Sequence, residues 1–191
     1  MENIFFDKHD LKYCGNNVII GKTVRIRKPQ EVIIGDNVII DDFTYIPCPV
    51  EIGSYTHIGA SCSMIGGSGF IKIGSFVNIA PSCQIVTGSE DYKGGGLAGP
   101  AIPIEYAGNI IIEPVIIGDF ALLACNTTVL PGAKIPEGMS TGAFTLVRKQ
   151  EYKSWSLYVG IPAKYHCERD GSEMKKTAER LLKDMAEKEK E

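Results

Sequence analysis

Residues 34–58 read IGDNVI-IDDFTY-IPCPVE-IGSYTH-I, with an isoleucine at every sixth position. The same spacing of aliphatic residues continues, with two interruptions, as far as Val147. A six-residue period fits neither an α-helix nor simple strand alternation, because a turn-forming residue such as Gly35 or Gly53 often follows the aliphatic residue. Each hexamer is therefore expected to form a short strand and a tight corner, and three hexamers to form one coil of a parallel β-helix.

A second position with small side chains recurs four residues after each aliphatic residue. Because the solenoid axis leaves room for one large and one small side chain per side, we expect both sets to point inward. The second set contains Val38, Thr44, Val50, Thr56, Cys62, Val77, Cys83, Ala121, Thr127, Ala133, Met139 and Thr145.

The composition excludes several classes of protein. The 191 residues carry a net charge of -3, so the global charge balance does not favour binding to nucleic acid. The longest apolar runs are too short for membrane insertion, and the N-terminal residues do not resemble a signal peptide. The six cysteines are scattered without a CxxC pair, and several fit the inward positions, so we expect free buried thiols and a cytoplasmic protein.

Breaks in the repeat divide the chain. Residues 1–15 precede the regular hexamers and are expected to cap the open end, and residues 16–149 are expected to form the β-helix domain. A long segment at residues 86–116 interrupts this domain, and such a loop is usually functional because ordering it costs entropy without adding core. Residues 150–191 are expected to close the solenoid and to end in an amphipathic helix.

The hexamers, the long loop, LPGA at residues 130–133 and GIPAK at residues 160–164 together resemble the hexapeptide-repeat acyltransferases. The likeness points to the sugar and cell-surface polysaccharide acetyltransferases. The resemblance implies an all-β fold, a left-handed parallel β-helix with an extruded loop and a C-terminal α-helix. It also implies a homotrimer whose active sites lie between subunits, with acetyl-CoA as donor and a small-molecule sugar hydroxyl or amine as acceptor. A nucleotide-linked sugar or a polysaccharide precursor is the expected acceptor.

The candidate catalytic residues are His57, Glu90 and Asp91. Related acetyltransferases carry a catalytic histidine near the start of the long loop, but Glu90 stands there in this chain. His57 precedes the inward Ile58, so it should point outward next to Asn78 of the following coil. We expect His57 to act as general base, with a loop carboxylate of a neighbouring subunit orienting it or binding substrate. Alternatively, His57 is an ordinary surface residue and a loop carboxylate acts directly.

Two further sets of residues are assigned by position. Small side chains on the late coils and nearby cations are expected to bind acetyl-CoA. The family resemblance further implies that backbone N–H groups near Cys125 face the thioester oxygen. This donor set is Ala124, Cys125, Gly142, Ala143, Arg148, Lys149, Lys164 and Arg169. The acceptor set is Asn78, Ser89, Tyr92, Glu105 and Tyr106.

The same fold is compatible with other functions. A zinc-dependent carbonic anhydrase on the same fold needs three histidine ligands, and only His57 lies in the coils, so no metal is expected. A trimeric scaffold or binding protein without catalysis is an alternative, as is an antibiotic acetyltransferase. Retention of the long loop and of the GIPAK motif favours an enzyme.

Overall fold

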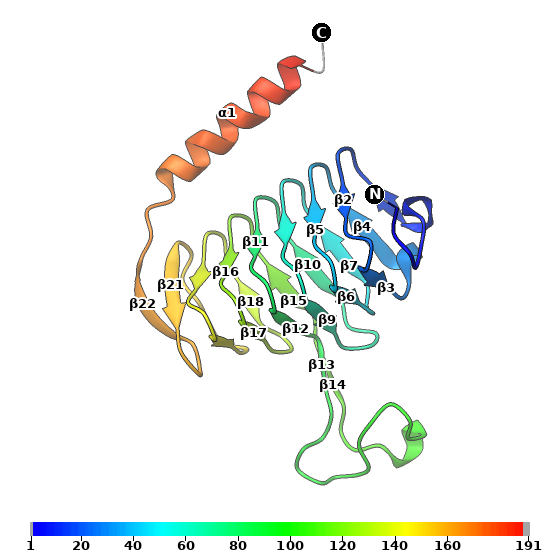
Figure 1. Cartoon of the computed structure of the whole chain (residues 1–191). Helices are drawn as coiled ribbons and strands as arrows, with labels where there is room; N and C mark the ends of the chain where they lie inside the picture. Colours follow the sequence, from blue (N-terminus) through cyan, green and yellow to red (C-terminus); the bar gives the residue numbers. More distant parts are fainter. Residues whose placement is uncertain (1, 189–191) are drawn as a thin grey trace.

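The computed structural model describes residues 2–188, so the expected cap and closure segments extend beyond it at residue 1 and at residues 189–191. The chain forms a left-handed parallel β-helix with three flat faces, as predicted (Figure 1). One long loop leaves the solenoid on one side, and one α-helix leaves it on the other.

Each face is one sheet of very short strands. Face A contains β1 (Tyr13–Cys14), β4 (Val32–Ile34), β7 (Val50–Ile52), β10 (Ile71–Ile73), β15 (Val115–Ile117) and β18 (Lys134–Ile135). Face B contains β2 (Ile19–Ile20), β5 (Ile39–Ile40), β8 (His57–Ile58), β11 (Asn78–Ile79), β16 (Leu122–Leu123), β19 (Ser140–Thr141), β21 (Ser156–Val159) and β22 (Lys164–Glu168). Face C contains β3 (Arg25–Ile26), β6 (Tyr45–Ile46), β9 (Ser63–Ile65), β12 (Gln84–Val86), β17 (Thr128–Val129) and β20 (Leu146–Val147).

Both predicted sets of inward side chains are buried. Every member of the second, smaller set is at most 1% exposed. The first set is at most 5% exposed and consists of Ile34, Ile40, Ile46, Ile52, Ile58, Met64, Ile73, Ile79, Ile85, Ile117, Leu123, Val129, Ile135, Thr141 and Val147. Thr141, the polar member, shares a 2.8 Å hydrogen bond with the hydroxyl of Thr127, so its burial leaves no unsatisfied group.

The glycines that follow the aliphatic residues allow successive coils to stack closely, and they do not adopt positive φ angles. A Cβ on Gly53 would lie 2.5 Å from the carbonyl carbon of Gly74 in the next coil, which no side chain tolerates. Positive φ angles occur instead two residues further on, at Asn37, Tyr55 and Phe76, with values of 56°, 57° and 58°. The corner therefore turns at these residues, while the glycines let successive coils approach.

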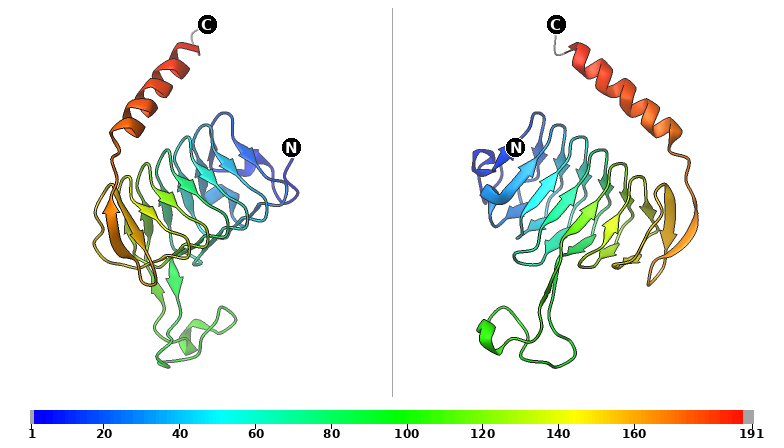
Figure 2. Two further views of the ribbon diagram at one scale, coloured as in Figure 1. Left: turned by 60° about the vertical axis from the view of Figure 1, so that its left-hand side comes forward. Right: turned by 180° about the vertical axis from the view of Figure 1, so that it is seen from behind.

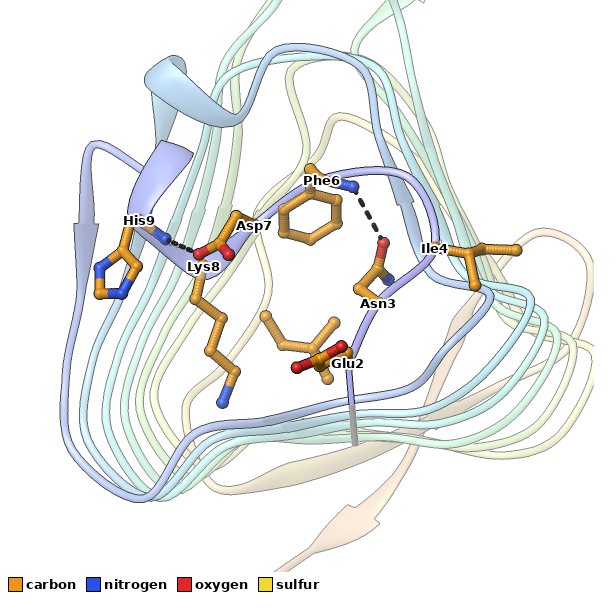
Figure 3. Close-up of a pocket in the computed structure, with 8 residues that line it drawn as sticks. Glu2, Asn3, Ile4, Phe6, Asp7, Lys8 and His9 are labelled. Carbon is orange, nitrogen blue, oxygen red and sulfur yellow. Dashed lines mark hydrogen bonds between the residues drawn. The ribbon is translucent and has the colours of Figure 1, made fainter.

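The solenoid begins before residue 16. Strand β1 lies in the segment expected to be a cap, and Tyr13 and Cys14 already pair in register with Ile33 and Ile34 of β4. The preceding residues, which include the 3-10 helix η1 (Lys8–Asp10), cross the open end of the triangle (Figure 3). They enclose a cavity of about 630 Å³. A second 3-10 helix, η2 (Pro29–Glu31), precedes β4.

The long loop leaves the corner after β12 without disturbing the register of the coils. Its base is an antiparallel ribbon of β13 (Gly88–Ser89) and β14 (Ile111–Ile112), and its distal part contains the 3-10 helix η3 (Ile104–Tyr106). The short excursion after β9 leaves the same corner, as predicted. The first residues of the two loops are neighbours, since the N–H of Thr87 donates to the carbonyl of Ile65 at 2.7 Å.

The C-terminal segment closes the solenoid and then departs from it. Strand β21 continues face B in parallel with β19, and β22 folds back antiparallel to β21. Helix α1 (Ser172–Lys188) then runs back along the corner between faces A and B (Figure 2). Trp155 anchors its start, since its ring packs 5.7 Å from that of Phe120 and 5.1 Å from the ammonium of Lys175.

Candidate functional site

His57 lies outward on face B, between two polar partners. In β8 the side chain of Ile58 points to the axis, so His57 points away from it. Its register neighbours are Ile39 of β5 and Asn78 of β11, which confirms the predicted stacking of His57 and Asn78. Its Nε2 lies 2.8 Å from Oδ2 of Asp41, and its Nδ1 lies 3.1 Å from Oδ1 of Asn78. The imidazole is 43% exposed, so it is accessible while its orientation is fixed.

Asp41 was not among the residues expected from the sequence. It directly follows Ile40, at the position that glycine occupies after Ile34 and Ile52. A carboxylate at a position that often carries glycine was the available signal. The backbone N–H of Asp41 donates to the carbonyl of Ile58 at 2.9 Å, which ties the corner to the coil that carries His57.

A groove of about 460 Å³ separates this part of the solenoid from helix α1. One wall is a ladder of stacked rings, in which Tyr55, Phe76 and Phe120 follow each other with centroids 5.1 Å apart. The remaining lining residues are His57, Val77, Asn78, Glu173, Met174, Thr177, Ala178 and Leu181. His57 and Asn78 thus face a largely apolar groove, which favours binding of a ligand with apolar parts.

The acidic loop residues differ in their surroundings. Asp91 accepts backbone hydrogen bonds from Lys93 at 2.8 Å and from Asn109 at 3.2 Å. These donors, that of Lys93 first, hold the pKa of Asp91 below its usual value. Asp91 therefore joins the two arms of the loop and is a weak base. Glu90 precedes it and offers its carboxylate for other partners.

The predicted acceptor residues of the loop extend from its base to its tip. Ser89 lies in β13, and its hydroxyl donates to the carbonyl of Glu90 at 3.3 Å. Tyr92 is 89% exposed, and Glu105 and Tyr106 are exposed in η3. Tyr92, Glu105 and Tyr106 are therefore accessible to a ligand or to a second subunit, whereas Ser89 is half-buried at the base of the loop.

The loop and His57 lie on opposite sides of the solenoid within one chain. His57 faces the groove beside α1, whereas the loop leaves from the far side in all views (Figures 1 and 2). A single chain therefore does not bring Glu90 or Asp91 to His57.

The small residues of the late coils already have structural partners. The N–H of Ala124 donates to the hydroxyl of Thr141 at 3.0 Å, which removes it from the donors available to a thioester oxygen. A Cβ on Gly142 would lie 2.9 Å from Cγ1 of Val159, so strand β21 accounts for this glycine. Cys125 and Ala143 are both exposed, and they lie at equivalent corners of successive coils, since the N–H of Phe144 donates to the carbonyl of Cys125 at 3.0 Å.

The four predicted cations differ in their surroundings. Lys149 forms a 2.6 Å ion pair with Glu113, and Arg148 donates to the side chain of Gln150 at 3.3 Å. Lys164 is exposed at the start of β22. Arg169 donates to the carbonyl of Gly138 and lies over the ring of Trp155, and burial lowers the pKa of its guanidinium. Arg169 therefore contributes to anchoring α1.

Two features are absent from the part of the chain that the structure describes. Residues 2–188 contain no group of three or more histidine, cysteine, aspartate or glutamate side chains arranged to hold a metal ion. Within the same residues, no helix combines the length and the apolar character needed to cross a membrane.

Comparison with known proteins defines the class of the protein. The family described as Bacterial transferase hexapeptide (six repeats) matches residues 31–66. An Escherichia coli protein, dTDP-4-amino-4,6-dideoxy-D-glucose acyltransferase, is 33% identical over 172 residues, which cover 88% of each chain. The chain therefore belongs to the hexapeptide-repeat acyltransferases, and it is a sugar acyltransferase.

Solved structures agree with this assignment. AntD, an N-acyltransferase from Bacillus cereus crystallised with dTDP and 3-hydroxybutyryl-CoA, is 31% identical with a TM-score of 0.87. The match covers 97% of this chain and 100% of that one. A maltose O-acetyltransferase from Clostridium difficile 630 is 19% identical with a TM-score of 0.56, and covers 85% of this chain and 72% of its own. That second likeness shows the fold alone.

Proposed function

We propose that the protein transfers an acyl group from an acyl-CoA to the amino group of a nucleotide-linked amino sugar. The observation that carries this proposal is the match along nearly the whole chain to AntD, whose crystals contain dTDP and an acyl-CoA. The Escherichia coli relative is named for a dTDP-linked amino sugar, which supports an amine acceptor over a hydroxyl. Acetyl-CoA is the donor expected from the sequence, and 3-hydroxybutyryl-CoA is the donor bound to AntD.

The reaction needs a base close to the acceptor nitrogen. The neutral amine attacks the thioester carbon, the C–N bond forms, the C–S bond breaks, and CoA leaves as its thiol. One proton therefore moves from the amine to the sulfur. His57, held at the surface of face B, is our candidate for carrying that proton. Glu90 is the candidate for binding the acceptor, because its carboxylate attracts the ammonium form of the amine.

We propose that the active enzyme is a homotrimer with sites between subunits. The loop carries Tyr92, Leu97, Ile104 and Tyr106 as exposed large apolar side chains, far from the groove of its own chain. A neighbouring subunit would cover them and would bring Glu90 toward a second copy of His57. Free thiols throughout the chain suit a reducing compartment, so we propose a cytoplasmic location.

Acceptor and donor assays test the proposal directly. CoA release is measured with acetyl-CoA or 3-hydroxybutyryl-CoA as donor and dTDP-4-amino-4,6-dideoxy-D-glucose as acceptor. The matched control is a dTDP-sugar with a hydroxyl at the same carbon. We expect CoA release with the amine only. Release with the hydroxyl sugar alone would refute N-acylation, and failure to bind either acyl-CoA in calorimetry would favour the scaffold function.

A further inference from the structure

We infer that Asp41 is a positioning residue of the transfer reaction, which holds His57 so that Nδ1 is the nitrogen that receives the proton of the acceptor amine. This inference rests on the proposed function, in which His57 carries the proton. The observation behind it is the contact of 2.8 Å between Oδ2 of Asp41 and Nε2 of His57.

The carboxylate of Asp41 decides which nitrogen of the neutral imidazole carries hydrogen. A neutral imidazole has one N–H donor and one acceptor nitrogen, and an ionised carboxylate can only accept. Nε2 must therefore carry the hydrogen when it contacts Asp41. The lone pair that can take up a proton is then on Nδ1, which faces Asn78 at the exposed surface of face B. A ring held in this way keeps its reactive nitrogen toward the solvent side, where an acceptor can approach.

Asn78 can serve both protonation states of the ring. Its Oδ1 lies 3.1 Å from Nδ1 and can accept a hydrogen bond from the protonated ring. Turning the amide by 180° presents Nδ2–H to the unprotonated Nδ1. The imidazolium formed by proton uptake is thus stabilised by Asp41 on one side and by Asn78 on the other. An acceptor nitrogen that displaces the exposed amide of Asn78 meets the lone pair of Nδ1.

The carboxylate of Asp41 points to the following coil, which carries His57. Its neighbour Asp42 points to the preceding coil, where it accepts hydrogen bonds of 2.8 Å from both the N–H and the hydroxyl of Thr23. The two adjacent carboxylates therefore have separate partners. The other titratable groups that line the groove with His57 are Tyr55 and Glu173 of α1.

Removal of the carboxylate charge is the test of this role. We expect Asp41→Asn to lower kcat about tenfold, as part of the roughly 10²–10⁴-fold that general base catalysis contributes. Asp42→Asn is the matched control, because it removes an adjacent carboxylate that does not contact His57. We expect its kcat to equal that of the unchanged enzyme.

A double-mutant cycle separates this inference from the function on which it rests. In a His57→Gln background, Asp41→Asn should cause no further loss if it acts through His57. An undiminished additional loss in that background would overturn the positioning role. Full turnover of His57→Gln alone would instead refute His57 as base.

Nitrogen NMR of the imidazole supplies a readout independent of activity. In the unchanged protein at high pH, Nε2 should show the protonated shift and Nδ1 the unprotonated shift. Asp41→Asn should mix the two tautomers, whereas Asp42→Asn should not. An Nδ1-protonated ring in the unchanged protein would contradict the inference even if the enzyme proves to be an N-acyltransferase.

Discussion

Replacement of Gly138 by alanine should destabilise the protein in two ways. Gly138 has a φ of 66°, and the indole of Trp155 lies over it, so that a Cβ would be 2.3 Å from Cδ2 of the ring. Placing alanine in the left-handed region costs about 1–2 kcal/mol. Moving a packed aromatic ring away from Phe120 costs about 1–3 kcal/mol more. We therefore expect Gly138→Ala to lower the free energy of unfolding by about 2–5 kcal/mol.

Gly67→Ala is the control that isolates the backbone cost. Gly67 has a similar φ of 63°, but a Cβ there would meet no atom within 4 Å. Its loss should be about 1–2 kcal/mol. Urea unfolding measures both losses, and the single tryptophan reports on the packing at residue 138. Emission should shift in Gly138→Ala only. Equal destabilisation by the two substitutions, with unchanged emission, would refute the role assigned to the indole.

Three other outcomes follow from the structure. Ile79→Ala, which removes a fully buried core side chain, should lower the free energy of unfolding by about 2–5 kcal/mol, whereas Ile39→Ala on the exposed side of face B should cost less than about 1 kcal/mol in the same urea titration. Burial raises the pKa of Cys48 to about 11, so a thiol reagent at pH 8 should label exposed Cys125 and leave Cys48 of the folded protein unlabelled. The contribution of Cys48 to the free energy of unfolding should fall as pH rises from about 9 to about 11. Hydrogen bonds from the amides of Lys93 and Asn109 lower the pKa of Asp91, so the NMR shifts of these amides should stay constant as pH falls through 3.8 and change only at lower pH. A transition above pH 3.8 would contradict that arrangement.

The hexamer period predicted the solenoid because each coil repeats one simple packing rule. Inward positions tolerate only apolar or small side chains, so the spacing from Ile34 onward was sufficient to assign the core and the register. The same spacing placed His57 beside Asn78, since equal positions of successive coils must stack. The residue types at a corner, by contrast, do not show which residue adopts the positive φ angle. The structure places it at Tyr55 and not at Gly53.

The candidate site was only partly predictable, for two physical reasons. The partner of His57 depends on which way the Asp41 side chain leaves its corner, and Asp42, one residue later, takes a different direction. Packing also requires small residues in the late coils, since a Cβ on Gly142 would lie 2.9 Å from Cγ1 of Val159. That contact comes from a strand outside the repeat, where the period carries no information.

The insertion point of the long loop has a consequence for how such proteins diversify. Strands β10 and β15 pair in full register although the loop separates them in the chain. The scaffold therefore does not depend on what the loop contains, and its length and composition can change without refolding the coils. Evolution or engineering could accordingly exchange this segment as an independent module, altering which molecule is recognised while the coiled support stays intact.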